Sequence, residues 1–324
     1  MRESLRLFNR FGMKLWLSSL AGGLFAIILL MIPHLFIGAM IRTNWSDANG
    51  FFKLWATSFL TDASYEQVIQ LVVYILDQGG PLLIIYTAFG ALLTFLVATY
   101  YIAGLVSTIH DAVTDHHVVI SHFFTEGLRK TFSLLGLFLC HMVMTGLFLA
   151  AIGALVILSG LKSGALIVTG IIGGVIYLFL LIIKTYSLVI LFSEELGVFR
   201  SLSYSFRSLF GNFLSTLTTF LTTYFTALLG AVVIGGVALF PWFVLQFFKD
   251  GTVALMVGVI IGGLALVLLG SLPVILTLIV LFTRYTQVIQ GDLFPEDHLQ
   301  ATLLRPTSHD KDWEATSTER IYRT

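Results

Sequence analysis

The fold is decided by long apolar runs, and the clearest of them is residues 164–193, GALIVTGIIGGVIYLFLLIIKTYSLVILFS. Lys184 is the one charged side chain in that stretch. About 20 apolar residues in a helix are enough to cross the hydrocarbon core of a bilayer, which is about 30 Å thick. Because every backbone N–H and C=O group in that core must be paired within its own segment, the run is predicted to be a transmembrane helix.

Five further apolar runs lie along the 324-residue chain. Hydrophobic residues make up 57% of the sequence and charged residues only 11%, and the mean hydropathy is +0.94. An ordinary soluble domain carries about 25% charged residues, and the alternation typical of membrane barrel strands is absent here. The sequence therefore predicts an all-α polytopic membrane protein. Its six predicted spans are residues 15–41, 81–109, 131–159, 164–193, 212–247 and 252–287.

The distribution of basic residues predicts the orientation in the membrane, because Lys and Arg concentrate in cytoplasmic loops. If the N-terminus is cytoplasmic, thirteen of the eighteen Lys and Arg residues lie inside, four lie outside, and Lys184 lies within a span. We therefore expect a multi-pass protein of a bacterial cell (inner) membrane with both termini in the cytoplasm.

Polar segments before the first, third and fifth runs share one pattern: a small residue, an apolar residue and an arginine. The chain is therefore predicted to consist of three pseudo-repeated hairpins. Each is led by an amphipathic interfacial helix whose arginine lies among anionic lipid headgroups. A tyrosine followed by an acid near the end of each hairpin supports the repeat: Tyr101 and Asp111, Tyr186 and Glu194, Tyr285 and Asp292. The three patterns are Ser4-Leu5-Arg6, Gly127-Leu128-Arg129 and Ser205-Phe206-Arg207.

Two segments are predicted to lie outside the bundle. Residues 42–80 form an outer loop with a helix of its own, which begins at the capping-box pattern of Ser64 and ends before Gly79-Gly80-Pro81. The chain becomes polar near its end, so residues 292–324 are predicted to be a disordered cytoplasmic tail. The six-helix transmembrane domain accordingly covers residues 1–291.

Ionisable side chains inside spans are rare, and they usually face a cavity or a partner. Here they include His141 in the third span and Lys184 in the fourth. Lys184 is expected to reach an acid or a carbonyl near the cytoplasmic side, with Asp111 and Glu194 as candidates. Both residues also fit a packing role, as a neutral histidine bonded to another helix and as a lysine that extends toward the interface.

Small and hydroxyl-bearing residues recur at helical spacing in three spans. Hydroxyls in the fifth span either line a polar pathway or serve helix packing, by bonding across to another helix or back to the backbone. Small residues spaced by four in the third and sixth spans indicate close helix contacts. The hydroxyl stripe is Ser215, Thr219, Thr222 and Thr226, and the small residues are Gly146, Ala150 and Ala154 in the third span and Gly258 and Gly262 in the sixth.

The sequence offers no catalytic, cofactor or metal motif, and we predict none of these sites. The nearest candidate is a polar cluster in the connection between the second and third spans. There His122 and Glu126 are four residues apart, as are Asp111 and Asp115, so each pair could share a helical face and bind one ion. A polar connecting loop explains the same residues. They are His110, Asp111, Asp115, His116, His117, His122 and Glu126.

One connection resembles a known family. Ser201-Leu202-Ser203-Tyr204-Ser205, preceded by Glu195-Leu196-Gly197 and followed by Gly211-Asn212-Phe213, is similar to the cytoplasmic connection of the glycerophosphoryl diester phosphodiesterase membrane-domain family and related uncharacterised bacterial six-span proteins. Glu126-Gly127-Leu128-Arg129 resembles a weaker first copy. In some members this bundle is fused to a soluble catalytic domain. We expect no such domain in this chain, so the resemblance implies the membrane fold without hydrolase activity.

These observations predict a non-catalytic bacterial integral membrane protein that supports an envelope process or a membrane partner. The alternative is a transporter, or the membrane subunit of one, with a polar route among spans three to five. An enzyme acting on lipids is a third class, for which the histidine cluster is the one candidate site. The expected partners are the bilayer, its anionic headgroups and a membrane protein, and not nucleic acid.

Overall fold

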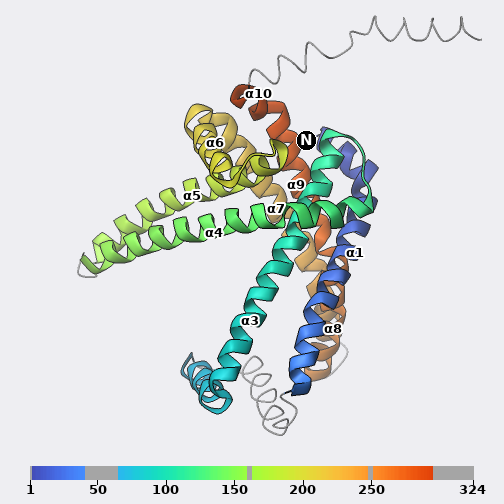
Figure 1. Cartoon of the computed structure of the whole chain (residues 1–324), viewed down its shortest axis with the longest axis vertical. Coiled ribbons are helices and arrows are strands. Elements are labelled where there is room, and N and C mark those ends of the chain that lie inside the picture. The colour runs from blue at the N-terminus through green and yellow to red at the C-terminus, as the bar shows by residue number, and fades with distance from the viewer. Residues whose placement is uncertain (1, 41–64, 159–162, 247–250, 295–324) are drawn as a thin grey trace, which may run out of the picture. The chain divides into compact units, whose positions relative to one another are not determined.

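The structure is a computed structural model that describes residues 2–40, 65–158, 163–246 and 251–294 (Figure 1). These residues are almost entirely helical, and no strand occurs among them. The helices are α1 (Arg2–Met40), α3 (Tyr65–Thr114), α4 (Ile120–Leu158), α5 (Ser163–Ser193), α6 (Val198–Gly211), α7 (Phe213–Gln246), α8 (Gly251–Leu269), α9 (Ser271–Arg284), the π-helix η2 (Tyr285–Ile289) and α10 (Gln290–Leu293).

The prediction of an all-α polytopic membrane protein is confirmed. Within the described ranges, six segments are long and apolar enough to cross a membrane. The sixth comprises more than one helix, because the α-helix is interrupted at Gly270 and passes into a π-helix at Tyr285. The six segments are Arg2–Met31, Ala88–Thr114, Ile120–Leu158, Gly164–Ser193, Phe213–Pro241 and Val257–Leu293.

The leading amphipathic segments differ in how they join their spans. The first two are continuous with the spans that follow, as parts of α1 and α4. Only the third, α6, is a separate helix, because Asn212 leaves the helical conformation with φ −126° and ψ 49°. Gly211 and Asn212 are weak helix formers, and the first two segments lack such a pair at the corresponding place.

The predicted helix of the outer loop is also continuous with a span. Helix α3 begins at Tyr65 and runs through Gly79-Gly80-Pro81 without an interruption, so the predicted boundary there is wrong. Proline removes one backbone donor, and membrane helices tolerate this. Residues 41–64 of the predicted loop and residues 295–324 of the predicted tail lie outside the described residues.

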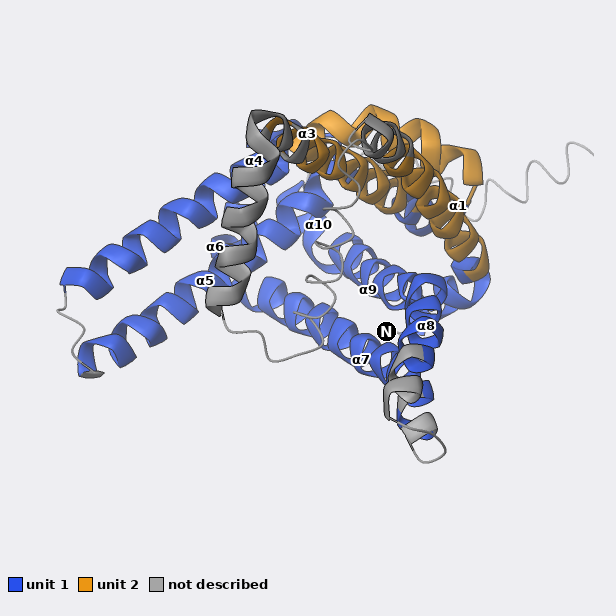
Figure 2. Cartoon of the chain, turned by 90° about the horizontal axis from the view of Figure 1, so that it is seen from below, with its two compact units in different colours: residues 1–12, 109–117, 136–324 blue, residues 13–108, 118–135 orange. Residues whose placement is uncertain are grey.

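The chain divides into two compact units, which are described separately (Figure 2). Unit 2 comprises residues 13–108 and 118–135, and its core is built around Phe123 at the start of α4. The Phe123 ring is fully buried, and it occupies the space where side chains would extend from Gly22 of α1 and Gly104 of α3. The Tyr101 and Ser19 hydroxyls are hydrogen-bonded at 2.6 Å, which joins α3 to α1.

Unit 1 comprises residues 1–12, 109–117 and 136–324. In it α5 packs against α6, and α7 packs against α8 and α9. The largest fully buried side chains include Tyr186, Ile190, Leu209, Phe282 and Tyr285. Helices α4 and α5 form a two-helix hairpin (Figure 1).

Candidate functional site

Two hydrogen bonds connect the polar residues of α4 and α5. His141 Nε2 lies 2.9 Å from Ser187 Oγ, and Lys184 Nζ donates to Thr145 Oγ1 at 2.5 Å. His141 and Ser187 are buried, whereas Lys184 and Thr145 are partly buried. The structure thus brings His141 and Lys184, the ionisable residues that the sequence analysis singled out in these two spans, into one cluster. We call the four residues the α4–α5 clamp.

The clamp has the same construction on both helices. Thr145 donates its hydroxyl proton to the carbonyl of His141, one turn earlier on α4, at 2.7 Å. Ser187 donates to the carbonyl of Lys184 on α5 at 3.0 Å. Because a hydroxyl has one proton, a Ser187 that donates to this carbonyl can only accept from His141, and the ring then carries a proton on Nε2. Each hydroxyl therefore accepts from the basic side chain of the other helix and donates to its own backbone.

This arrangement favours a structural contact. A hydroxyl whose proton is bonded to a backbone carbonyl is not free to pass that proton on. The predicted acid partners of Lys184 are not observed, because among the described residues no carboxylate lies within ion-pair distance of its ammonium. The partner is a hydroxyl instead. Interhelical hydrogen bonds of this kind contribute about 0.6 kcal/mol on average in membrane proteins, and up to about 1.7 kcal/mol.

The predicted hydroxyl stripe on α7 is only partly the buried face of that helix. Thr219 and Thr226 are buried, but Ser215 and Thr222 are half-buried. The buried face continues through two other threonines, because the positions that pack inward recur at spacings of three and four: Thr216, Thr219, Thr223 and Thr226.

The hydroxyls of the α7 face bond mainly to the backbone. Thr223 and Thr226 donate to carbonyls one turn earlier on α7, at 2.9 and 2.8 Å. Thr216 lies 3.0 Å from both the hydroxyl and the carbonyl oxygen of Ser208 on α6. Of the predicted stripe, Thr226 bonds back to the backbone of its own helix. The packing role of the stripe and a polar pathway along α7 both stay hypotheses.

A second polar junction surrounds Glu194, at the end of α5. One carboxylate oxygen accepts from the buried Tyr285 hydroxyl at 2.9 Å and from Gln290 Nε2 at 3.1 Å. Tyr285 and Gln290 belong to η2 and α10, so Glu194 joins two hairpins of unit 1. Tyr285 and Glu194 are both repeat markers in the sequence, but the sequence does not predict that they pair.

The three small-apolar-Arg patterns occupy similar environments. The small residue is buried in each case, and the apolar residue and the arginine that follow it are exposed. Leu128 and Phe206, for example, are 66% and 39% exposed. An exposed apolar side chain beside an arginine suits the boundary between acyl chains and headgroups. The buried members are Ser4, Gly127 and Ser205.

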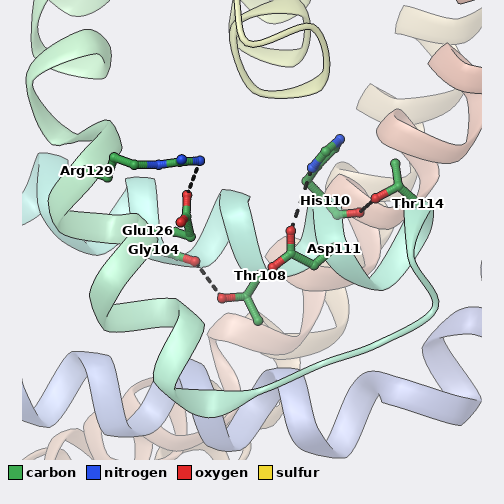
Figure 3. Close-up of polar contacts among 7 residues, drawn as sticks. All are labelled: Gly104, Thr108, His110, Asp111, Thr114, Glu126 and Arg129. Atoms are coloured by element: carbon green, nitrogen blue, oxygen red, sulfur yellow. Dashed lines mark hydrogen bonds and ion pairs between the residues drawn. The ribbon is translucent and has the colours of Figure 1, made fainter.

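The polar residues near the start of α4 and the end of α3 form local pairs (Figure 3). In unit 2, Arg129 lies 2.6 Å from Glu126, one turn earlier on the same helix. In unit 1, His110 Nδ1 lies 3.8 Å from Asp111. The described part of the chain contains no group of three or more His, Cys, Asp or Glu residues that could hold a metal ion.

Comparisons with known proteins do not name a family. No family model matches the chain, and no curated protein or solved structure matches it at the significance required. The resemblance to the phosphodiesterase membrane-domain family and the three-hairpin repeat both stay predictions.

Proposed function

We propose that this chain is a non-catalytic integral membrane protein of a bacterial inner membrane that supports a membrane partner. The docking element in this proposal is the α4–α5 hairpin, and the partner is a transmembrane helix of another protein. Both chain termini are cytoplasmic in this arrangement.

The observation that carries the proposal is the exposure of apolar side chains on both helices of the hairpin. Leu147 and Ile157 of α4 are 68% and 76% exposed, and Ile167 and Ile171 of α5 are each 64% exposed. The clamp joins α4 to α5 by two side-chain hydrogen bonds. The pair therefore presents a fixed apolar surface in the membrane.

Small residues favour a helix over lipid as the occupant of that surface. Gly146, Ala150 and Ala154 were predicted to make a close helix contact, but all three are exposed, and no atom lies near the Cβ position of Gly146. The predicted contact is therefore not made within the described chain. Small residues spaced by four let two membrane helices approach closely, so this face suits a second protein.

Site-specific photo-crosslinking in native membranes tests the proposal. A photoreactive residue at Leu147 is expected to give one discrete adduct with another membrane protein, and Ala150→Leu is expected to abolish it while the chain stays folded. The matched control position is Ile260 of α8, which is equally exposed at 69%. Labelling of lipid alone, equal labelling from Ile260, or a link within the chain to α1 or α3 would contradict the proposal.

One observation favours the transporter alternative, namely the lysine inside a span. Intramembrane ionisable residues commonly mark ion or substrate pathways. Lys184→Met separates the two functions. Under the partner proposal the variant folds, loses only the bond to Thr145 and keeps the Leu147 adduct. Under the transport alternative it folds equally well but loses its function in cells, measured by complementation of a deletion strain.

A further inference from the structure

The first three turns of α1 and the connection after α3 line an open hollow of about 460 Å³ in unit 1. We propose that this basic hollow binds the phosphate group of an anionic phospholipid. The inference is independent of the proposed partner of the α4–α5 hairpin. The residues that line the hollow are Arg2, Glu3, Arg6, Leu7, Arg10 and His116.

The charge of the basic hollow is positive, with three guanidinium groups and one carboxylate in its lining. Arg2, Arg6 and Arg10 recur every four residues, so they lie on one face of α1. None of them forms an ion pair with a residue of the described chain. Arginine presents a planar set of donors that matches two phosphate oxygens at once.

The single acid in the lining has a partner of its own. The Glu3 carboxylate accepts a hydrogen bond from the side-chain amide of Gln287, in η2. This contact joins the start of α1 to the end of the sixth span within unit 1. The three arginines are thus left as the charged groups available to a ligand.

The remaining lining residues suit an amphiphilic ligand. Leu7 is buried and adds an apolar surface, whereas His116 adds a polar ring. His116 has φ 53°, in the left-handed region that non-glycine residues seldom adopt, and it directly follows Asp115, which closes the end of α3 by a bond to the Asp111 carbonyl at 3.0 Å. The chain thus brings a strained residue to the edge of the basic hollow.

The membrane setting commits the ligand to a lipid rather than a free phosphate. The basic hollow lies at the first turns of α1, the helix whose residues Arg2–Met31 form the first membrane-length segment, and Leu5 beside Arg6 is 49% exposed. Such a helix end lies at headgroup level. The formal net charge of the chain is zero, so attraction to anionic lipid must come from a local group of charges rather than from the whole protein.

Native mass spectrometry of the full-length protein in detergent, titrated with phosphatidylglycerol or phosphatidylcholine, tests the proposal. Phosphatidylglycerol is expected to bind with a 1:1 component that phosphatidylcholine lacks. Arg6→Gln with Arg10→Gln is expected to weaken that component about tenfold or more, because each basic residue near anionic lipid contributes substantially to binding. The matched control is Arg200→Gln with Arg207→Gln, which removes the same charge from exposed positions on α6.

Other outcomes of these titrations would overturn the proposed lipid site. Equal weakening by both double variants would mean diffuse attraction and would overturn the site. Inorganic phosphate that displaces phosphatidylglycerol at matched concentration would overturn the lipid assignment in favour of a soluble phosphate ligand. Arg6→Lys, which keeps the charge but not the planar donor set, is expected to weaken binding less than the double variant. The lipid site would be overturned if Arg6→Lys binds phosphatidylglycerol as tightly as wild type while circular dichroism shows that the Arg6→Gln, Arg10→Gln variant is unfolded.

Discussion

The α4–α5 hairpin and the hairpin of α7 with α8 and α9 pack by two different means within unit 1. Side-chain hydrogen bonds join α4 to α5, through His141 with Ser187 and Lys184 with Thr145. Close backbone approach joins α7 to its neighbours: Gly262 lies against the Ala238 carbonyl, and Gly230 lies against Pro273.

The difference shows what each hairpin can tolerate. In a bilayer the hydrophobic effect does not drive helices together, so they associate through tight packing or through interhelical hydrogen bonds. A contact between backbones cannot yield to an added methyl group, because both sides are rigid. A contact between long or hydroxyl-bearing side chains can yield, because a rotamer change relieves it. Steric substitutions should therefore damage the α7 hairpin more, and polar substitutions the α4–α5 hairpin.

The largest effect is expected from Gly262→Leu. A Cβ atom at Gly262 would collide with the Ala238 carbonyl oxygen, and this backbone atom cannot move aside. Overpacking of a tight core commonly costs about 1–3 kcal/mol and occasionally more, so we expect at least about 3 kcal/mol. The measurement is the thermal unfolding temperature and the monodisperse fraction in detergent.

Gly263→Leu is the matched control for this substitution. It places the same side chain one residue along α8, where no atom lies within 4 Å of the Cβ position. It should leave the unfolding temperature close to that of wild type. Similar losses from Gly262→Leu and Gly263→Leu would show that the two helices do not approach closely at Ala238.

Two glycine-to-alanine substitutions, one in each hairpin, compare how well the two hairpins accept an added methyl group. At Gly230 a Cβ would lie 2.5 Å from Pro273 Cβ, whereas at Gly173 of α5 the nearest atom is the flexible tip of Ile152, at 3.1 Å. Gly230→Ala is expected to destabilise by about 1–3 kcal/mol and Gly173→Ala by less than about 0.5 kcal/mol. Reversed magnitudes in the same unfolding assay would overturn the comparison.

The helical fold was predictable from the sequence because a bilayer permits few choices. Six apolar runs of sufficient length must be helices, and six such segments are observed. Breaks between helices were harder to predict. Gly79-Gly80-Pro81 has the composition of a boundary, yet α3 continues through it, whereas Asn212 does end a helix. Local propensity disfavours a helix more strongly at Gly79-Gly80-Pro81 than at Asn212, yet the break occurs at Asn212, so the sequence pattern alone does not decide where a helix ends.

Two of the four residues of the α4–α5 clamp could be predicted from the sequence. His141 and Lys184 stood out because charge inside a span is rare, but Thr145 and Ser187 did not. A usable signal was present: each hydroxyl lies one turn after the basic residue on its own helix. The pairing between helices depends on their register, which no local pattern in one helix specifies. The same limit applies to the α7 stripe, where the buried face follows Thr216 and Thr223 rather than Ser215 and Thr222.

A double-mutant cycle on His141→Leu and Ser187→Ala measures the polar contact of the clamp. The expected coupling free energy is about 0.6 kcal/mol, with about 1.7 kcal/mol as the upper bound for such bonds in a membrane protein. Reversible unfolding in mixed detergent and SDS gives the four stabilities that the cycle needs. If the two substitutions are additive within error, side-chain hydrogen bonding does not hold α4 to α5.

The smallest effect is expected from Thr226→Val on α7. This substitution distinguishes a buried hydroxyl that bonds within its own helix from one that bonds to another helix. Among the described residues, Thr226 bonds only to the Thr222 carbonyl of its own helix. Replacement by valine therefore removes no hydrogen bond between the described helices and should change stability by less than about 0.5 kcal/mol. Thr216→Val is the matched control on the same helix, because its hydroxyl lies 3.0 Å from the Ser208 hydroxyl and carbonyl oxygens on α6. It should cost about 1 kcal/mol. Equal losses at both positions would mean that threonine hydroxyls bind α7 to its neighbours along its whole length, and the contrast between the two hairpins would disappear.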